Sequence, residues 1–344
     1  MKMKKVIIYV LLITAAAAAF AGYLENKAAP KPKEAKTETA DSAQMPVIVW
    51  DKACKYNNTL KSADILAPVL FRMNSEGGFD ELSSKEFTDS VNADVWGVFT
   101  NAFDPELTRT VMQNEEKRKQ LCERTAELCN AYDLEGVNID FENMYSDDSA
   151  LFTEFIKDLS EKLHENSKIL SVDVTKINKG SMFYSMCYDR GEISKYADYV
   201  ILMGYDQYPR TSPVPGPVSA LNWTEEAISD MLSEVPTEKF ILGVPLYTRL
   251  WEQNGGVMVS SNALSMDESE QIKIENGGQS VLDTDSGLDY FEFENGSSKF
   301  SVWQENGSSL KKRIELAQKY NLSGIACWCL GFENTEADEI LSEL

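Results

Sequence analysis

Apolar runs alternate with amphipathic stretches along most of this 344-residue chain, and the alternation predicts an α/β fold. Eight short runs rich in β-branched, leucine and aromatic residues have the length of strands. They span 47–50, 65–71, 95–100, 135–142, 169–175, 199–205, 240–247 and 324–330. Helical spacing of apolar residues is clearest between such runs, over 114–132, 149–165 and 223–235. Eight strands separated by crossover-length segments predict a parallel sheet closed into a (β/α)8 TIM barrel.

One connection is too long for a simple crossover helix. Residues 252–300 separate the seventh and eighth predicted strands. Within this stretch, two alternating runs in DYFEFENGSSKFSVW (289–303) flank the dipeptide Asn295-Gly296, which is a strong signal for a β-hairpin. The sequence therefore predicts a small α+β insertion between strands 7 and 8, on the rim of the barrel.

The N-terminal segment has the pattern of an export signal. Three lysines precede an apolar stretch that runs from Val6 to Leu24 and is interrupted only by Thr14. Its length suits both a cleaved signal peptide and an uncleaved signal anchor, so residues 1–24 remain open between the two. The polar, proline-containing residues 25–45 are predicted to form a disordered linker. Either way, residues 46–344 are expected to be extracellular or at the cell surface, with membrane contact only through the N-terminal segment.

Charge and residue usage limit the chemistry that the body can perform. The formal charge is −22; residues 1–44 contribute seven basic and four acidic groups, which leaves −25 on the other 300 residues. Such a surface disfavours nucleic acid as a partner. The six cysteines lack metal-site spacing and are expected to be mainly unpaired core residues. Because His164 is the lone histidine and is expected at the surface, acid–base chemistry must come from carboxylates and tyrosines, without a metal or cofactor.

The fourth predicted strand, EGVNIDFE, carries the strongest functional signal. Side chains alternate along a strand, so Asn138, Asp140 and Glu142 would share one face while the apolar residues between them face the other. In a barrel the polar face points inward and rises toward the C-terminal mouth, where the active sites of this fold lie. Glu142 would reach a ligand, and Asp140, one pleat below, could hydrogen-bond it and shift its pKa. The alternative is an edge strand with solvated acids.

A second motif, ILMGYDQY, ends the sixth predicted strand. Met203 and Tyr205 would point inward, and Asp206 would turn into the following loop. A Tyr-Asp pair at a strand end is by itself weak, but it lies two strands from Asp140 and Glu142. Further residues could line a groove or serve in packing and capping, and the sequence leaves this open: Asp173, Asn101, Tyr247, Arg249, Trp251 and, on the last strand, Trp328.

Together these segments resemble glycoside hydrolase family 18, the chitinase-like (β/α)8 enzymes. Residues 135–142 resemble the family pattern DGxDxDxE, residues 203–206 resemble MxYD, and Trp328 matches a tryptophan that ends the last strand. The segments VWGVFTNAFDPELTR and PLYTRLW are most similar to a Firmicute branch near spore-cortex and cell-wall N-acetylglucosaminidases. The resemblance covers roughly residues 46–340.

The resemblance implies a retaining glycosidase that cleaves β-1,4 N-acetylglucosamine linkages of peptidoglycan or spore cortex with help from the substrate's own acetamido group. Glu142 would be the acid and base, Asp140 would orient the acetamido group, and Tyr205 and Asp206 would hold the distorted sugar. The candidate substrate-binding residues are Trp328, Asn138, Met203, Asp173, Tyr247 and Asn101. A chitinase and a non-catalytic carbohydrate-binding barrel remain alternatives, and the presence of Glu142 favours an enzyme.

Two positions depart from the family pattern. Glu135 replaces the first aspartate and is expected at the base of the strand, where it matters little. Asn138 stands where many chitinases have an acid. Because an amide cannot share a proton with a carboxyl group, Asp140 is expected to ionise more readily here.

Overall fold

The computed structural model describes residues 45–344, except 59 and 182. The predicted signal or anchor over 1–24, and the predicted linker up to residue 44, lie outside the described residues. Among the described helices, none has both the length and the apolar character needed to cross a bilayer.

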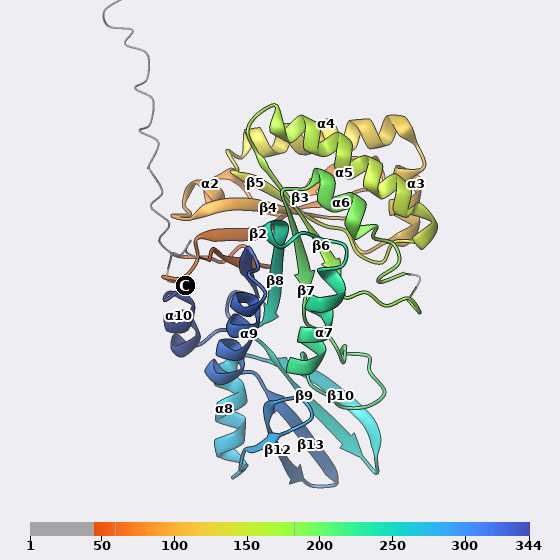
Figure 1. Ribbon diagram of the computed structural model, residues 1–344. Helices are drawn as coiled ribbons and strands as arrows, with labels where there is room; N and C mark the ends of the chain where they lie inside the picture. Colours follow the sequence, from red (N-terminus) through yellow and green to blue (C-terminus); the bar gives the residue numbers. More distant parts are fainter. Residues whose placement is uncertain (1–44, 59, 182) are drawn as a thin grey trace, which may run out of the picture. The chain divides into compact units, whose positions relative to one another are not determined.

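A closed barrel forms the centre of the described structure (Figure 1). Its eight parallel strands follow the order β1-β14-β8-β7-β6-β5-β4-β2, and pairing of β1 with β2 closes the ring. Their bounds are β1 Val47–Asp51, β2 Ile65–Met73, β4 Asp94–Thr100, β5 Gly136–Asp140, β6 Ile169–Thr175, β7 Tyr199–Met203, β8 Phe240–Pro245 and β14 Gly324–Trp328. The short β3 (Phe79–Glu81) pairs antiparallel with the end of β2. The TIM-barrel prediction is confirmed.

Several strands end earlier than their apolar runs suggested. β5 ends at Asp140 and β7 ends at Met203, so Glu142 and Tyr205 lie just beyond the last ladder residues. Likewise, β8 ends at Pro245, two residues before Tyr247. The alternation of faces continues past the hydrogen-bonded ladder, and these side chains therefore stand at the C-terminal mouth rather than within the barrel wall.

Helices cover the outside of the barrel. They are α2 Lys85–Asp89, α3 Pro105–Met112, α4 Glu115–Ala131, α5 Ser149–His164, α6 Arg190–Tyr196, α7 Leu221–Met231, α9 Gly307–Lys319 and α10 Thr335–Leu341, with 3-10 turns at Ser146–Asp148 and Thr237–Lys239. The predictions for α4 and α5 are confirmed to within one residue. The prediction for α7 began two residues too late and extended four residues too far. Pro236 disfavours helical backbone in the residue before it, and the chain turns over 232–235. His164 ends α5 at the surface, as expected.

The two faces of β5 have the predicted environments. Phe141, directly after β5, packs outward against Phe155 and Phe152 of α5, with ring centroids 5.6 and 5.9 Å apart. The barrel interior holds a separate apolar cluster in which Trp96 stacks on Tyr199 at 5.5 Å. Because these rings help fill the lower barrel, polar inward residues are confined to the C-terminal end. Five of the six cysteines are buried, Cys54 is partly exposed, and all six are free thiols.

The predicted insertion between barrel strands 7 and 8 is present as a second, five-stranded sheet. Its order is β10-β9-β13-β12-β11, and it lies with α8 at the bottom of Figure 1, away from α4 and α5. The elements are β9 Thr248–Asn254, β10 Val257–Leu264, α8 Met266–Glu275, β11 Val281–Asp283, β12 Leu288–Asn295 and β13 Ser298–Gln304. The β12–β13 hairpin is present, with Asn295 paired to Ser298. Gly296 therefore occupies the first central turn position, at a φ of +63°.

A buried ion pair joins the insertion to the barrel. Glu305, directly after β13, binds Arg313 of α9 through two contacts of 2.7 and 2.9 Å, and both side chains have no exposed surface. The Glu305 amide donates to Thr248 Oγ1 at the start of β9, and Arg313 also donates to the carbonyl of Ser219. Ser219 Oγ in turn donates to the carbonyl of Gly204, the residue before Tyr205. This network connects α9, both ends of the insertion and the loop after β7.

Replacement of Arg313 by Met should lower the free energy of unfolding by about 3–5 kcal/mol, because the Glu305 carboxylate is left buried without its cation. Lys319→Met, on the same helix, removes an exposed ion pair with Glu225 and should cost less than about 1 kcal/mol. Urea denaturation of both variants measures the difference. Equal losses for the two would contradict a structural role for the buried pair.

Candidate active site

Glu142 is held at the barrel mouth through its main chain. Asn101, which follows β4, accepts a hydrogen bond from the Glu142 amide at 3.0 Å and donates one to the Glu142 carbonyl at 2.7 Å. The same Asn101 amide group donates to Thr108 Oγ1 in α3. On the other side, the hydroxyl of Tyr188 donates to the carbonyl of Phe141 at 2.8 Å. The backbone that carries the acid is therefore fixed from two neighbouring loops.

The surroundings of Glu142 favour its protonated form. Burial, followed by the negative charges of Asp140 and Asp206, raises the pKa of Glu142 to about 8. Within the described part of the chain, no lysine, arginine or histidine forms an ion pair with Glu142 or Asp140 that would offset this. The charge of Asp140 therefore helps to keep the proton on Glu142. Glu142 can therefore donate a proton at neutral pH.

A buried polar layer lies beneath Glu142. Asn138 has no exposed surface; its amide oxygen accepts from Trp50 Nε1 at 3.0 Å, and its nitrogen donates to Asp173 Oδ1 at 2.9 Å and to Ser171 Oγ at 3.0 Å. Asp140 Oδ1 is buried and has no hydrogen-bond partner. This layer brings Asp140 and Asp173, from adjacent strands, into one environment.

The expectation that Asp140 would ionise more readily is wrong. Burial first, and then the charge of Asp173, raise the pKa of Asp140. Burial likewise raises the pKa of Asp173, opposed by the hydrogen bond from Asn138. Asn138 leaves β5 without a carboxyl group at this position, but Asp173 on the neighbouring β6 places one close to Asp140.

Aromatic rings form the floor of the site. Tyr205 stacks on Trp328 with centroids 6.0 Å apart and planes inclined by 22°. Trp50 meets both rings edge-on, at 6.4 Å from Tyr205 and 5.7 Å from Trp328. Tyr205 and Trp328 remain partly exposed, whereas Trp50 is buried. The pKa of Tyr205 is raised by burial and by Asp173, Asp140 and Glu142, so its hydroxyl stays protonated beside all three carboxyls.

Asp206 is placed on the rim by an unusual backbone conformation and two donors. Its φ of +57° lies in the left-handed region, which turns the chain out of β7. The Tyr247 hydroxyl and Arg249 Nη2, the latter at 2.9 Å, both donate to Asp206 Oδ1. Trp251 is buried instead, with Nε1 bonded to the carbonyl of Gly216 at 2.8 Å, and serves in packing.

The structure thus separates the residues predicted from sequence into two groups. Glu142, Tyr205, Asp206 and Trp328 gather at the mouth, with buried Asp140 in the layer below Glu142 and partly exposed Met203 one pleat below Tyr205. Burial leaves almost no surface for a ligand on four residues that were predicted to bind substrate, and they support the site from behind. These are Asn101 and Asn138 (both 0% exposed), Asp173 (2%) and Tyr247 (4%).

Two supporting residues were missed. Trp50 ends the first apolar run, and its alternation with Ile48 could have placed it inside the barrel. Tyr188 lies in an irregular segment before α6, where no periodic pattern marks it.

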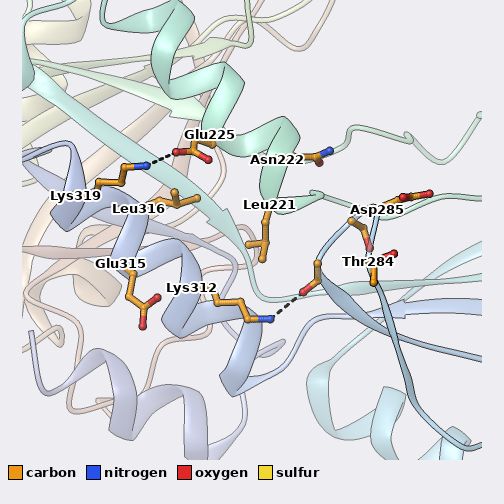
Figure 2. Close-up of a pocket in the computed structure, with 11 residues that line it drawn as sticks. Leu221, Asn222, Glu225, Thr284, Asp285, Lys312, Glu315, Leu316 and Lys319 are labelled. Carbon is orange, nitrogen blue, oxygen red and sulfur yellow. Dashed lines mark hydrogen bonds and ion pairs between the residues drawn. The ribbon is translucent and has the colours of Figure 1, made fainter.

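The described residues contain no group of His, Cys, Asp or Glu arranged to hold a metal ion. A separate cavity of about 410 Å³ lies between α7, α9 and the turn at 284–287 (Figure 2). It shares no residue with the mouth, and its lysines already have partners: Lys312 donates to the Gly287 carbonyl and Lys319 pairs with Glu225.

Glu142→Gln should stabilise the protein near neutral pH. Between the ordinary carboxyl pKa and about 8, the unfolded chain releases a proton that folded Glu142 retains, so the wild type loses stability as pH rises through this interval. Glutamine cannot ionise and avoids the loss. We expect a gain of about 1–2 kcal/mol near neutral pH and none at about pH 4. Thermal unfolding of both proteins at the two pH values checks this, and a gain that is independent of pH would contradict it.

Comparison with known proteins identifies the family of this chain. Residues 10–333 match the model of glycosyl hydrolases family 18. The glycosylase YvbX of Bacillus subtilis (strain 168) is 27% identical over 248 residues, which are 70% of this chain and 71% of YvbX. The cortical fragment-lytic enzyme of the same organism is 25% identical over 272 residues, and the match spans 75% of this chain and 62% of that enzyme.

A solved structure shares the fold. A chitinase from Chromobacterium violaceum superposes with a TM-score of 0.77 at 19% identity, over 87% of this chain and 98% of the chitinase. The family match extends over β5 with Glu142 just beyond it and over β7 with Tyr205 just beyond it. This chain belongs to glycosyl hydrolases family 18, and its TIM barrel is that of a glycosidase.

Proposed function

We propose that this protein hydrolyses β-1,4 linkages of N-acetylglucosamine in peptidoglycan or spore cortex, with retention of the anomeric configuration. One observation carries the proposal: Glu142 stands at the barrel mouth with its pKa raised to about 8. A carboxylic acid that keeps its proton at neutral pH is the group that must protonate a glycosidic oxygen.

The first step is proton transfer from Glu142 to the oxygen of the leaving sugar. In most retaining glycosidases a second carboxylate attacks the anomeric carbon, but family 18 is an exception in which the substrate's acetamido group does so. The acetamido carbonyl oxygen bonds to the anomeric carbon as the glycosidic bond breaks, which gives a cyclic oxazolinium ion. The unpartnered Oδ1 of Asp140 is suited to accept the acetamido N–H and to stabilise the positive charge.

The second step returns the enzyme to its starting state. Glu142, now a carboxylate, takes a proton from water, and the resulting hydroxide oxygen attacks the anomeric carbon and opens the oxazolinium ring. Two displacements at one carbon give retention. The hydroxyl of Tyr205 can donate to the acetamido carbonyl, and Asp206, held by Tyr247 and Arg249, can fix the distorted sugar.

The nature of the substrate is supported by three features. The stacked Tyr205 and Trp328 offer flat apolar surface for a sugar ring. The mechanism needs an N-acetyl group, which N-acetylglucosamine carries. Among the relatives, the cortical fragment-lytic enzyme is named for the lysis of cortical fragments.

We also propose that the protein is exported. The basic and apolar pattern of residues 1–24 would direct residues 46–344 outside the cytoplasm, where wall glycan is accessible. Contact with the membrane would be limited to this N-terminal segment.

Wild type and Glu142→Gln should be incubated with purified peptidoglycan and with N-acetylglucosamine oligomers, and the release of reducing ends followed. Loss of the general acid should lower turnover by about 10²–10⁴-fold while binding is kept. Oligomers without the N-acetyl group are the control and should not be cleaved, since the internal nucleophile is absent. Binding without turnover in the wild type and in the variant would instead identify a carbohydrate-binding barrel, and turnover of oligomers alone would identify a chitinase.

The pH profile and the stereochemistry give a further prediction. Since Glu142 must be protonated to donate, kcat/KM should fall as pH rises through about 8. Proton NMR of the first product should show the β-anomer before mutarotation. Initial formation of the α-anomer would mean inversion and would contradict the two-step mechanism.

A further inference from the structure

Two buried carboxyl groups beneath Glu142 lie on neighbouring strands. β5 and β6 pair in parallel with Asn138 opposite Ser171 and Ile139 opposite Val172. Continuation of this register places Asp140 beside Asp173, and adjacent strands are about 4.8 Å apart. The two side chains share the inward face, with Asp140 8% and Asp173 2% exposed. A carboxyl pair therefore occupies the barrel interior directly below the proposed proton donor.

The hydrogen bonds around this pair are incomplete. The Asn138 side-chain nitrogen donates hydrogen bonds to Asp173 Oδ1 and to Ser171 Oγ. The Asn138 side-chain oxygen accepts a hydrogen bond from Trp50 Nε1. Asp140 Oδ1 is buried with no donor at all. The Asn138 amide is fully used, so it cannot satisfy Asp140 as well. A proton between the two carboxyls would supply the missing donor.

The charged and titratable groups that face the pair add no positive charge. They are Glu142 after β5, Tyr205 after β7 and Tyr188 before α6. Asp206 acts on Glu142 and is bonded by Tyr247. Arg249 is engaged with Asp206 on the rim. Within the described residues, no cationic side chain forms an ion pair with Asp140 or Asp173. Two ionised carboxylates side by side in such a setting are strongly disfavoured.

We propose that Asp140 and Asp173 hold a single proton between them, and that Asp173 is a positioning residue that controls the ionisation of Asp140. The proton moves from the Asp140 carboxyl to the Asp173 carboxylate and back, so the pair keeps a charge of −1 while its location changes. When the proton lies on Asp173, the Asp140 carboxylate accepts a hydrogen bond from the Asp173 carboxyl. It can then accept a second hydrogen bond from a ligand at the barrel mouth. Asn138 cannot share a proton with Asp140, and Asp173 on β6 shares it instead.

A shared proton separates the two ionisations of the pair. The first proton leaves at low pH because the remaining one bonds the new carboxylate, and the second leaves only at high pH. Glu142 therefore faces one negative charge rather than two over a wide pH range. Removal of Asp173 leaves Asp140 as an isolated buried acid, which ionises only at higher pH than the pair's first step.

The pair can be tested without any substrate. Infrared difference spectra on the full chain detect the carbonyl stretch of a protonated carboxylic acid, and a Glu142→Gln background removes the contribution of that acid. At neutral pH we expect one protonated carboxyl in Glu142→Gln, whose band persists up to the late second ionisation of the pair. On addition of Asp173→Asn, or equally of Asp140→Asn, the remaining acid has no charged partner beside it, so its band should disappear at lower pH. Glu161→Gln, on the exposed face of α5, is the matched control and should leave the band unchanged.

Two outcomes would overturn the proposal. A band that disappears at the same pH with and without Asp173→Asn shows that Asp173 does not control the ionisation of Asp140, and absence of the band at neutral pH in Glu142→Gln means that both carboxyls are ionised. If Asp173→Asn does not fold, as judged by circular dichroism, the pH dependence of the band in Glu142→Gln decides: a shared proton gives one carboxyl that ionises at low pH and a second that ionises only at high pH, and ionisation of both at one ordinary pH contradicts it.

Kinetics give a second readout, which rests on the proposed glycosidase function. In Asp173→Asn the acidic limb of kcat/KM should move upward by about one pH unit, while the alkaline limb set by Glu142 stays in place. A merely structural role would lower kcat at every pH without moving a limb. An acidic limb that does not move, or an alkaline limb that moves downward instead, contradicts the shared proton. Absence of hydrolysis by the wild type would refute the proposed function and leave the infrared result to decide the pair.

Discussion

Burial of carboxyl groups without a compensating cation is the constraint on which this site depends. Burial is the largest cause of the raised pKa at Asp140, Glu142 and Asp173, and the negative charges of neighbouring acids add to it. The barrel makes this possible, because aromatic and aliphatic side chains fill its lower interior and leave polar residues only at the C-terminal end. A lysine in the same place would favour the ionised form of the acid.

The energetic cost of this arrangement is offset by contacts that do not involve the carboxyl groups. Asn101 and Tyr188 hold the main chain around Glu142, and Trp50 joins the aromatic floor to the buried Asn138. Such contacts fix the position of the acid while leaving its protonation free to respond to a ligand. Position and charge are thereby controlled by different residues, as preorganised catalytic sites require.

Much of this could be predicted from the sequence because it depends on local periodicity. Alternation in EGVNIDFE assigned Asn138, Asp140 and Glu142 to one face, and eight apolar runs at crossover spacing predicted the barrel. The partner of Asp140 could not be predicted, since Asp173 is remote in sequence and meets it only through strand register. The same holds for Asn101, whose role depends on a loop contact with Glu142, and for Tyr188, which lies outside any periodic element. Local patterns indicate which face a side chain occupies, and tertiary contacts decide what it meets there.

The Glu305–Arg313 pair has a consequence for how this barrel can be modified. Its hydrogen bonds reach both ends of the insertion and, through Ser219 and Gly204, the residue before Tyr205. The second sheet is consequently not an independent module that can be exchanged at its two junctions. A chimera that takes the corresponding segment from another barrel must also take matching partners for Arg313 and Ser219. Without them, the loop that carries Tyr205 loses hydrogen bonds that hold it in place.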